Sequence, residues 1–186
     1  MATRKTIRSM LAAGSPLAIG RAREVAALVL ANPCQAPSLV ECLWDEDTGV
    51  ANRAADALEH VSRDRPSILD PWSASLLGLL GEAIESRLRW NLVQIVPRLA
   101  LKGPEARRAA VLLETCLEDR SSIVKTSAMQ GLADLARRDQ SMFPEVLDLL
   151  RIHTRSGTPA MRARGRKLLK ILEPPTRELS CPAHRR

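Results

Sequence analysis

Few of the residues that could carry chemistry lie close together in this sequence. The three histidines are scattered, and Cys181 and His184 form a C-x-x-H pair in a proline-containing C-terminal stretch. One such pair cannot complete the four-ligand tetrahedral set of a structural zinc site. The acidic run Asp45-Glu46-Asp47 falls in an expected turn and is typical of solvated, helix-capping charge. With no phosphate-binding glycine loop and no G-x-S-x-G motif, the sequence predicts no enzyme and no metal or cofactor site.

The composition favours a helical protein of a reducing compartment. Of the 186 residues, 45% are hydrophobic but only 2% are aromatic, which argues against a β protein and against a base-stacking platform. The four cysteines lie far apart without a C-x-x-C pair, which indicates reduced thiols in the cytoplasm. No stretch approaches 18 apolar residues, so no membrane span is expected. The basic, acid-free residues 1–23 leave mitochondrial-type targeting as an alternative.

Amphipathic helices are the elements that must position the remaining candidates. In residues 121–139, Val124, Ala128, Leu132 and Leu135 are four, four and three residues apart, so they share one side of a helix. The same ladder recurs over 50–61, 88–99 and 161–172, and successive ladders start 38, 36 and 37 residues apart. A second set of apolar helical segments lies between them, at about 36–44, 67–83, 104–118 and 142–153.

Local start signals support this division into helix pairs. Polar residues lie three positions before each ladder, and all but Glu85 are types that favour an N-cap: Asp47, Glu85, Ser121 and Thr158. Prolines mark the starts of the intervening helices, and Pro97 is predicted to bend the helix over 88–101. A period near 37 residues with two helices per unit is typical of an α-solenoid.

The ladders also resemble a known family, the HEAT repeat, in which a Val-Lys or Val-Arg-like dipeptide precedes A-x-x-x-L-x-x-L. The matching pieces are Val124-Lys125 with Ala128, Leu132 and Leu135; Leu88-Arg89 with Leu92, Val96 and Leu99; and Met161-Arg162 with Leu169 and Leu172. The resemblance covers about residues 36–172, and the copy at 50–61 departs from it with Ala51 at the basic position. It implies a right-handed α-solenoid of about four HEAT-like helix pairs plus an N-terminal helix, which serves as a binding scaffold. We expect this domain over 16–172, between a flexible basic N-terminus (1–15) and a flexible tail (173–186).

Three successive repeats carry a basic residue at one shared position: Arg89, Lys125 and Arg162. Because equivalent positions of stacked helices lie about 10 Å apart, these residues predict a positive stripe on the side of the second helices. Arg53 and Arg164 share another register that could widen the stripe, and Trp90 is a further candidate contact. The stripe could bind an acidic protein or phosphates. The alternative, which the HEAT resemblance implies, is a structural residue that pairs with acids near the interrepeat turn.

The excess of positive charge lies at the ends of the chain. Residues 151–186 hold ten basic and two acidic residues, whereas 25–150 hold 13 basic and 18 acidic residues. Four basic side chains of the last helix form a candidate polyanion site: Arg162, Arg166, Lys167 and Lys170. The alternative is a polar cap that keeps the open end of the solenoid soluble.

The three tryptophans test a DNA-repair interpretation. Some alkylpurine DNA glycosylases are built on HEAT-like repeats, and their sites resemble a Trp followed one helical turn later by a catalytic Asp. Here the residues one turn after Trp44, Trp72 and Trp90 are Thr48, Leu76 and Gln94. The carboxylate is missing each time, so this resemblance fails, and packing is the alternative role of each Trp.

The sequence therefore predicts a non-catalytic HEAT-like scaffold that binds another protein, one with an acidic surface, through the face of its second helices. The alternative is a DNA- or RNA-binding protein that uses the same stripe together with the basic last helix. Neither a membrane nor a small-molecule substrate is indicated.

Overall fold

The computed structural model of the chain describes residues 4–13 and 20–173, and every regular element within these ranges is helical. The prediction of an all-α protein is therefore confirmed. The α-helices of the described residues are α1 (Arg4–Ala12), α2 (Ala22–Ala31), α3 (Ala36–Glu41), α4 (Thr48–Asp64), α5 (Ser73–Glu82), α6 (Ser86–Ile95), α7 (Pro104–Thr115), α8 (Ser122–Arg138), α9 (Phe143–Ser156) and α10 (Pro159–Leu172). Among these helices, none combines the length and the apolar character that a membrane span requires.

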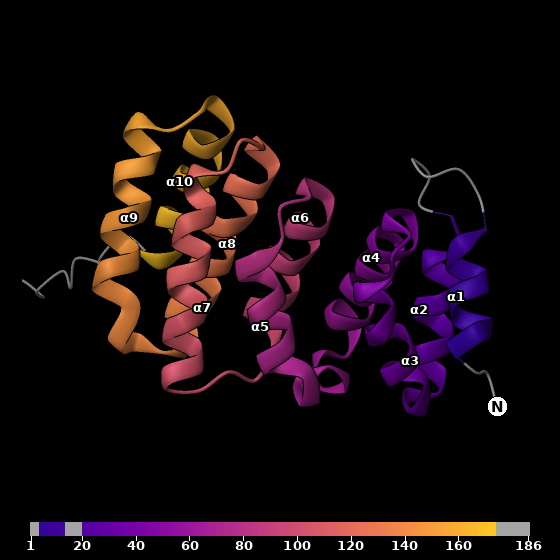
Figure 1. Cartoon of the computed structure of the whole chain (residues 1–186). Helices are drawn as coiled ribbons and strands as arrows, with labels where there is room; N and C mark the ends of the chain where they lie inside the picture. The colour runs from indigo at the N-terminus through magenta and orange to yellow at the C-terminus, as the bar shows by residue number, and fades with distance from the viewer. Residues whose placement is uncertain (1–3, 14–19, 174–186) are drawn as a thin grey trace, which may run out of the picture.

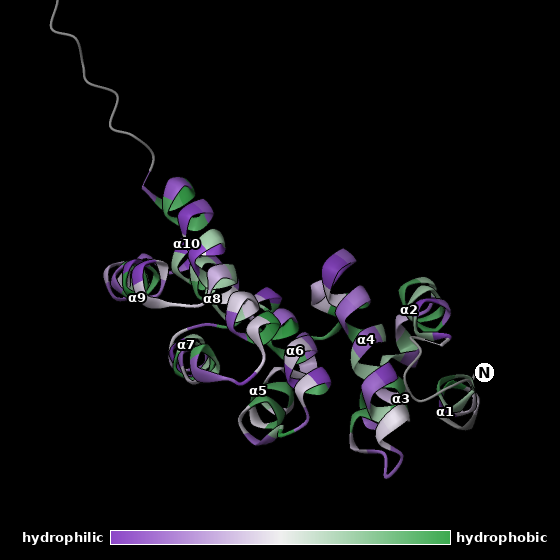
Figure 2. Ribbon diagram, turned by 90° about the horizontal axis from the view of Figure 1, so that it is seen from above, coloured by the Kyte–Doolittle hydropathy of each residue, from purple (hydrophilic) through white to green (hydrophobic). Residues whose placement is uncertain are grey.

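The helices lie side by side in chain order, from α1 at one end of the molecule to α9 and α10 at the other (Figure 1). Seen from above they form a curved row, with α5, α7 and α9 on one side and α4, α6, α8 and α10 on the other (Figure 2). We call α4, α6, α8 and α10 the second helices, and α3, α5, α7 and α9, which precede them, the first helices. Each second helix packs against the next one along the row, so their equivalent positions are neighbours in space.

The predicted apolar ladders form the core between the two layers. All four ladder residues of α4 and all four of α8 are buried: Val50, Ala54, Leu58, Val61, Val124, Ala128, Leu132 and Leu135. In α10 the ladder residues Met161 and Gly165 are buried, whereas Leu169 is only half-buried and its neighbour Leu168 is buried instead. Gly165 faces Thr154 of α9 so closely that a Cβ atom would overlap the Thr154 hydroxyl. A glycine in the middle of α10 is therefore required by the packing of this last helix pair.

Two of the three predicted N-caps, Asp47 and Thr158, are confirmed, and Glu85 is a further cap. Asp47 accepts hydrogen bonds from the backbone N–H groups of Gly49 and Val50, and the Glu85 and Thr158 side chains each accept one from the first turn of their helix. The third prediction is wrong, because the Ser121 side chain makes no capping bond. Its own N–H instead donates to the Asp119 carboxylate at 2.7 Å.

Pro97 ends the α-helix rather than bending it. The regular α6 stops at Ile95, and a 3-10 turn over Val96–Arg98 completes the segment that was predicted as one helix. The proline ring and its missing N–H prevent the α-helical hydrogen bond at this point, and a tighter turn accommodates it.

The N-terminal prediction is corrected by α1. Residues 1–15 are predicted to be flexible, but α1 spans Arg4–Ala12 and its Ile7 and Leu11 side chains are fully buried. Arg8 on the same helix forms an ion pair with Asp45 at 2.6 Å. Two apolar side chains one turn apart are enough to bury one face of a short helix once α4 lies beside it. The predicted C-x-x-H pair, Cys181 and His184, lies outside the described residues.

Candidate binding face on the second helices

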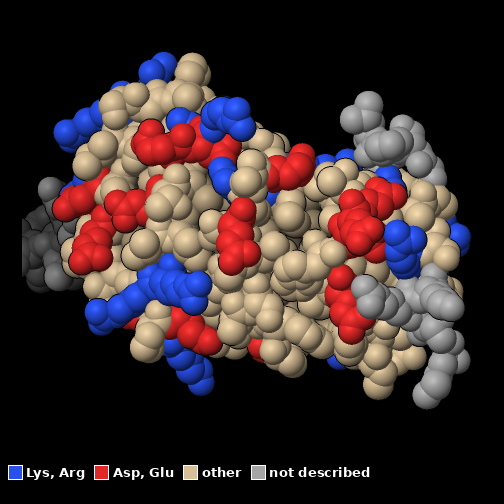
Figure 3. Space-filling view, viewed as in Figure 1, with Lys and Arg blue, Asp and Glu red and all other residues tan. Residues whose placement is uncertain are grey.

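The second helices expose a row of side chains on the side turned away from the first helices. Its members are Asn52, His60 and Arg63 of α4; Trp90, Gln94 and Arg98 of α6 and its 3-10 turn; Thr126, Gln130 and Asp134 of α8; and Ala163, Lys167 and Ile171 of α10. We call this surface the second-helix face. The opposite side of the molecule carries small groups of both charge signs, and neither sign covers it (Figure 3).

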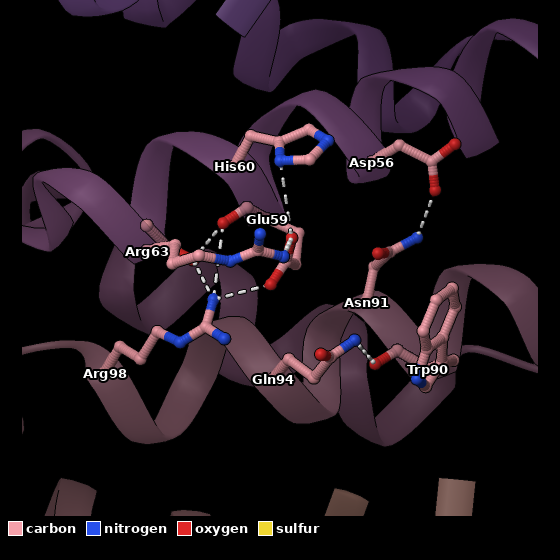
Figure 4. Close-up of polar contacts among 9 residues, drawn as sticks. Asp56, Glu59, His60, Arg63, Trp90, Asn91, Gln94 and Arg98 are labelled. Carbon is pink, nitrogen blue, oxygen red and sulfur yellow. Dashed lines mark hydrogen bonds and ion pairs between the residues drawn. The ribbon is translucent and has the colours of Figure 1, made fainter. Parts of the chain in front are cut away.

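Asp56 is one of two buried carboxylates that join α4 to α6. Its side chain is 9% exposed and accepts hydrogen bonds from Asn91 Nδ2 at 2.8 Å and from Arg87 Nη2 at 2.5 Å. Figure 4 shows Asn91 of α6 directed at Asp56 across the interface between the two helices. A buried carboxylate needs such partners, because removing its hydration without replacement is costly.

Glu59, one turn further along α4, is the second buried carboxylate. It accepts hydrogen bonds from Arg63 Nη2 at 2.5 Å and from Arg98 Nη1 at 2.9 Å, and Arg98 also donates to the Ser62 hydroxyl (Figure 4). Burial raises the pKa of Glu59, but the hydrogen bonds and charges of the two arginines outweigh burial and lower the pKa. His60 Nδ1 lies 3.9 Å from the Glu59 carboxylate, too far for a hydrogen bond. The cluster is therefore an interhelical clamp of ionised groups.

The predicted stripe begins with Arg89, and this residue is tied down on both sides. Its guanidinium donates to the Asp119 carboxylate at 2.5 Å and to the Ala83 backbone carbonyl. Ala83 lies just before α6 and Asp119 just before α8, so Arg89 joins the turns of two consecutive repeats. Burial raises the pKa of Asp119, but the hydrogen bonds from Ser121 and Arg89 outweigh it and lower the pKa. We call the Arg89–Asp119 pair the turn latch.

The two other members of the stripe have different surroundings. Lys125 is half-buried, and among the described residues it has no ion pair or hydrogen bond through its amine. The residue that would pair with Lys125, as Asp119 pairs with Arg89, lies two residues before the cap of α10. This residue is Ser156, which has no carboxylate. Arg162 is exposed and donates to the Gly157 carbonyl at 3.1 Å. The structure therefore places Arg89, Lys125 and Arg162 at equivalent positions but with three different sets of partners.

The turn latch was missed as a pair, although the sequence contains a signal for it. The same pattern, Cys-Leu-x-Asp, ends the first helix at 42–45 and again at 116–119, 74 residues later. In both copies the aspartate accepts a backbone N–H two residues on and an arginine from a preceding helix: Arg8 for Asp45, and Arg89 for Asp119. The aspartate that accepts these hydrogen bonds thus recurs in two turns. The spacing of the apolar ladder residues does not reveal it, because the aspartate lies outside the ladder.

Arg53 does not belong to any binding surface. It is 2% exposed, and its Nε donates to the Leu11 carbonyl of α1. A partner cannot reach this guanidinium, so the prediction that Arg53 widens the stripe is wrong. Its aliphatic stem also lies against Gly20, where a Cβ would come within 3.0 Å of Arg53 Cδ. Trp90 is half-buried against the core, whereas Trp44 is 52% exposed.

The basic residues of α10 include positions that are buried in every preceding second helix. Eight residues after the cap, Ala55, Val93 and Met129 are fully buried, whereas the equivalent Arg166 is exposed. Lys170 is likewise exposed where its equivalent in α8, Ala133, is buried. These exposed basic side chains suit a helix whose outer side no other helix of the described residues covers. They favour the cap over the polyanion site for Arg166 and Lys170.

A pocket of about 210 Å³ opens between α6, α8 and α10 on the second-helix face. Its polar lining comes from all three segments: Gln94 and Arg98, then Ser127, Gln130 and Asp134, then Arg164. Arg164 donates to Gln130 Oε1 at 3.2 Å, and Gln130 Nε2 donates to Asp134 Oδ1 at 3.1 Å. Of the predicted stripe, Arg164 therefore lines this pocket, and the pocket itself was not predicted.

No family model matches this sequence, and no curated protein matches it either. Within residues 4–13 and 20–173, no three His, Cys, Asp or Glu side chains are close enough together to hold a metal ion.

Proposed function

We propose that this protein is a HEAT-like α-solenoid that acts as a non-catalytic scaffold and binds another protein through its second-helix face. One observation carries the proposal: four consecutive second helices present equivalent positions side by side on one surface. The buried carboxylates of that surface are each neutralised by arginine, which is the arrangement of a rigid platform.

The composition of the face supports a protein partner with acidic groups. Arg63, Arg98, Arg164 and Lys167 lie on or beside the face, and the half-buried Trp90 adds an amphipathic contact. A cytoplasmic location suits the thiols, since no disulfide joins the cysteines within the described part of the chain.

Capture from a nuclease-treated native lysate, with the full chain as bait, tests the proposal. The face variant places three acidic side chains on second helices outside the pocket: Asn52→Glu, Thr126→Glu and Lys167→Glu. A control variant makes the same total charge change at exposed positions of the first helices: Ser75→Glu, Arg108→Glu and Ile152→Glu. We expect the wild type and the control to retain one protein that the face variant loses, with equal helicity and melting temperature in all three.

The alternative is binding of DNA or RNA, and α10 is the observation that favours it. This helix carries five basic residues and no acidic one, whereas a polar cap could use either sign. Nucleic-acid binding predicts that log affinity falls with log salt by roughly 0.7–0.9 per neutralised phosphate. Retention of nuclease-sensitive material alone, or a face variant that keeps its protein partner, contradicts the scaffold proposal.

A further inference from the structure

The pocket between α6, α8 and α10 exists because one interhelical bridge is missing. In each second helix, the side chain six residues after the N-cap can form a hydrogen bond with the preceding second helix. Its partner there is the side chain nine residues after that helix's N-cap. Asn91 makes this bridge to Asp56 at 2.8 Å, and Arg164 makes it to Gln130 at 3.2 Å. The equivalent residue in α8 is Ser127, whose hydroxyl is too short to span the gap.

Gln94, the expected acceptor of the missing bridge, turns back to its own helix. Its Nε2 donates to the Trp90 carbonyl at 3.2 Å (Figure 4). Among the described residues, no hydrogen bond joins Gln94 to Ser127. Below this gap the helices stay close, since a Cβ on Gly131 would lie 2.7 Å from Pro97 Cγ. The result is a hollow with a packed floor rather than a general separation of α6 from α8.

The groups around the hollow favour an anion with one charge. Arg98 uses only Nη1 for its partners in α4, and Arg164 has a neutral partner, Gln130, and no carboxylate among the described residues. Glu59 is shared by Arg63 and Arg98, so the three guanidinium groups of this region, with Arg164, meet two carboxylates and leave one positive charge. The second carboxylate, Asp134, already accepts from Gln130. Arginine matches the two oxygens of a carboxylate, and Asp134 disfavours a doubly charged phosphate.

We propose that this pocket is a subsite for one acidic side chain, Asp or Glu, of a protein segment that lies along the second-helix face. The inference rests on the proposed function, because the segment must run over the face to place its side chain there. Arg164 and Arg98 bind the carboxylate, and the Ser127 hydroxyl donates a further hydrogen bond. The acidic side chain thus replaces the bridge that Ser127 cannot make.

Two model peptides test the subsite: the acetylated and amidated repeat (Gly-Ala-Glu-Ala)3 and its Gln counterpart. Each is titrated into the 15N-labelled full chain, and the Nε–H resonances of Arg98 and Arg164 are followed by NMR. We expect both resonances to shift with the Glu peptide, and the Gln peptide to bind about tenfold more weakly, as for one lost charge-assisted contact.

Substitutions at the gap sharpen the test. Ser127→Asn supplies the bridging amide found at Asn91 and fills the hollow, so it should weaken the Glu peptide about tenfold without lowering the melting temperature. Arg164→Gln should weaken binding of the Glu peptide by a similar factor. Arg162→Gln, which lies outside the pocket, should bind within about threefold of the wild type.

Equal affinity for the two peptides, unchanged binding by Ser127→Asn, or shifts confined to the basic residues of α10 would overturn the subsite. Its failure can be separated from failure of the scaffold proposal by repeating the lysate capture with Ser127→Asn. If wild type and Ser127→Asn retain the same protein equally, the subsite proposal is contradicted and the scaffold proposal is not. If wild type retains no protein but still binds the Glu peptide in the pocket, the scaffold fails and a carboxylate site remains.

Discussion

Asp119→Asn tests whether the basic position of the repeat is structural. The Asp119 side chain is 4% exposed; one oxygen accepts from Arg89 at 2.5 Å and the other from the Ser121 N–H at 2.7 Å. Asparagine keeps one acceptor oxygen but turns a donor NH2 toward the other partner. The substitution therefore removes one charge-assisted hydrogen bond, which is worth about 1.5–3 kcal/mol. Because the Arg89 side chain is 29% exposed and can regain water, we expect about 2 kcal/mol.

Urea unfolding followed by circular dichroism at pH 7 measures this cost directly. A loss of about 2 kcal/mol corresponds to a fall of about 4–8 °C in melting temperature for a chain of this length. The double-mutant cycle with Arg89→Gln should give a coupling energy of about 1–2 kcal/mol. Lys125→Gln is the matched control at the equivalent position, and we expect it to stay within about 0.5 kcal/mol of wild type.

The pH dependence of the same variant provides an independent check. The folded protein lowers the pKa of Asp119, so its stabilising contribution is complete above the unfolded value of about 3.9 and is lost as pH falls through the lower, folded value. Wild type and Asp119→Asn should therefore converge in stability as the pH falls below the unfolded value and through the lower, folded one. A coupling energy near zero at pH 7, or a cost for Lys125→Gln as large as that for Asp119→Asn, would refute the turn latch. The shared basic position would then be better explained by binding.

Three further predictions concern stability. Glu59→Gln should cost about 2–3 kcal/mol at pH 7, and, because the folded pKa of Glu59 is lowered, the difference should shrink as pH falls below about 4.3 in urea titrations. Arg53→Ala should cost about 2–4 kcal/mol in the same assay and leave partner capture at permissive temperature unchanged, since Arg53 is buried. Gly165→Ala should cost about 1–3 kcal/mol, with partial recovery by Thr154→Ala, whereas Gly78→Ala in open space should gain about 0.5–1 kcal/mol.

The helices were predictable because their signals are local. A ladder with steps of four, four and three residues forms a buried stripe in any helix that finds a neighbour, and this placed α4 and α8 correctly. The missing cap at Ser121 has no explanation in the structure, because Asp45 accepts the N–H of Asp47 just as Asp119 accepts that of Ser121, and Asp47 still caps α4. Ile7 and Leu11 are buried because α1 packs against α2, α3 and α4, and the sequence of a short basic segment does not predict these contacts.

The candidate site was less predictable because it depends on pairs of residues about 30–40 positions apart. Arg53 occupies a helical position that suggests exposure, and its burial follows from α1 folding over it. Periodicity identified Arg89 and Lys125 as equivalent, yet only Arg89 faces an aspartate, since Ser156 replaces Asp119 one repeat later. The role of a side chain is therefore predicted less well by its equivalent position in each repeat than by whether a complementary side chain is present in the adjacent repeat.

This complementarity gives a physical way to separate structural from binding residues in a repeated fold. Where both members of an interhelical pair are present, as in Asn91 with Asp56, their hydrogen bonds are satisfied within the chain, and substitution should cost stability. Where one member is shortened, as at Ser127, the fold tolerates the gap because the surrounding ladder remains buried. Polar groups left around such a gap must be satisfied by water or by a ligand, and a ligand that supplies the missing group gains affinity without reorganising the helices. Binding can therefore be selected at little cost to folding at the gap beside Ser127, rather than at the equivalent basic residues Arg89, Lys125 and Arg162.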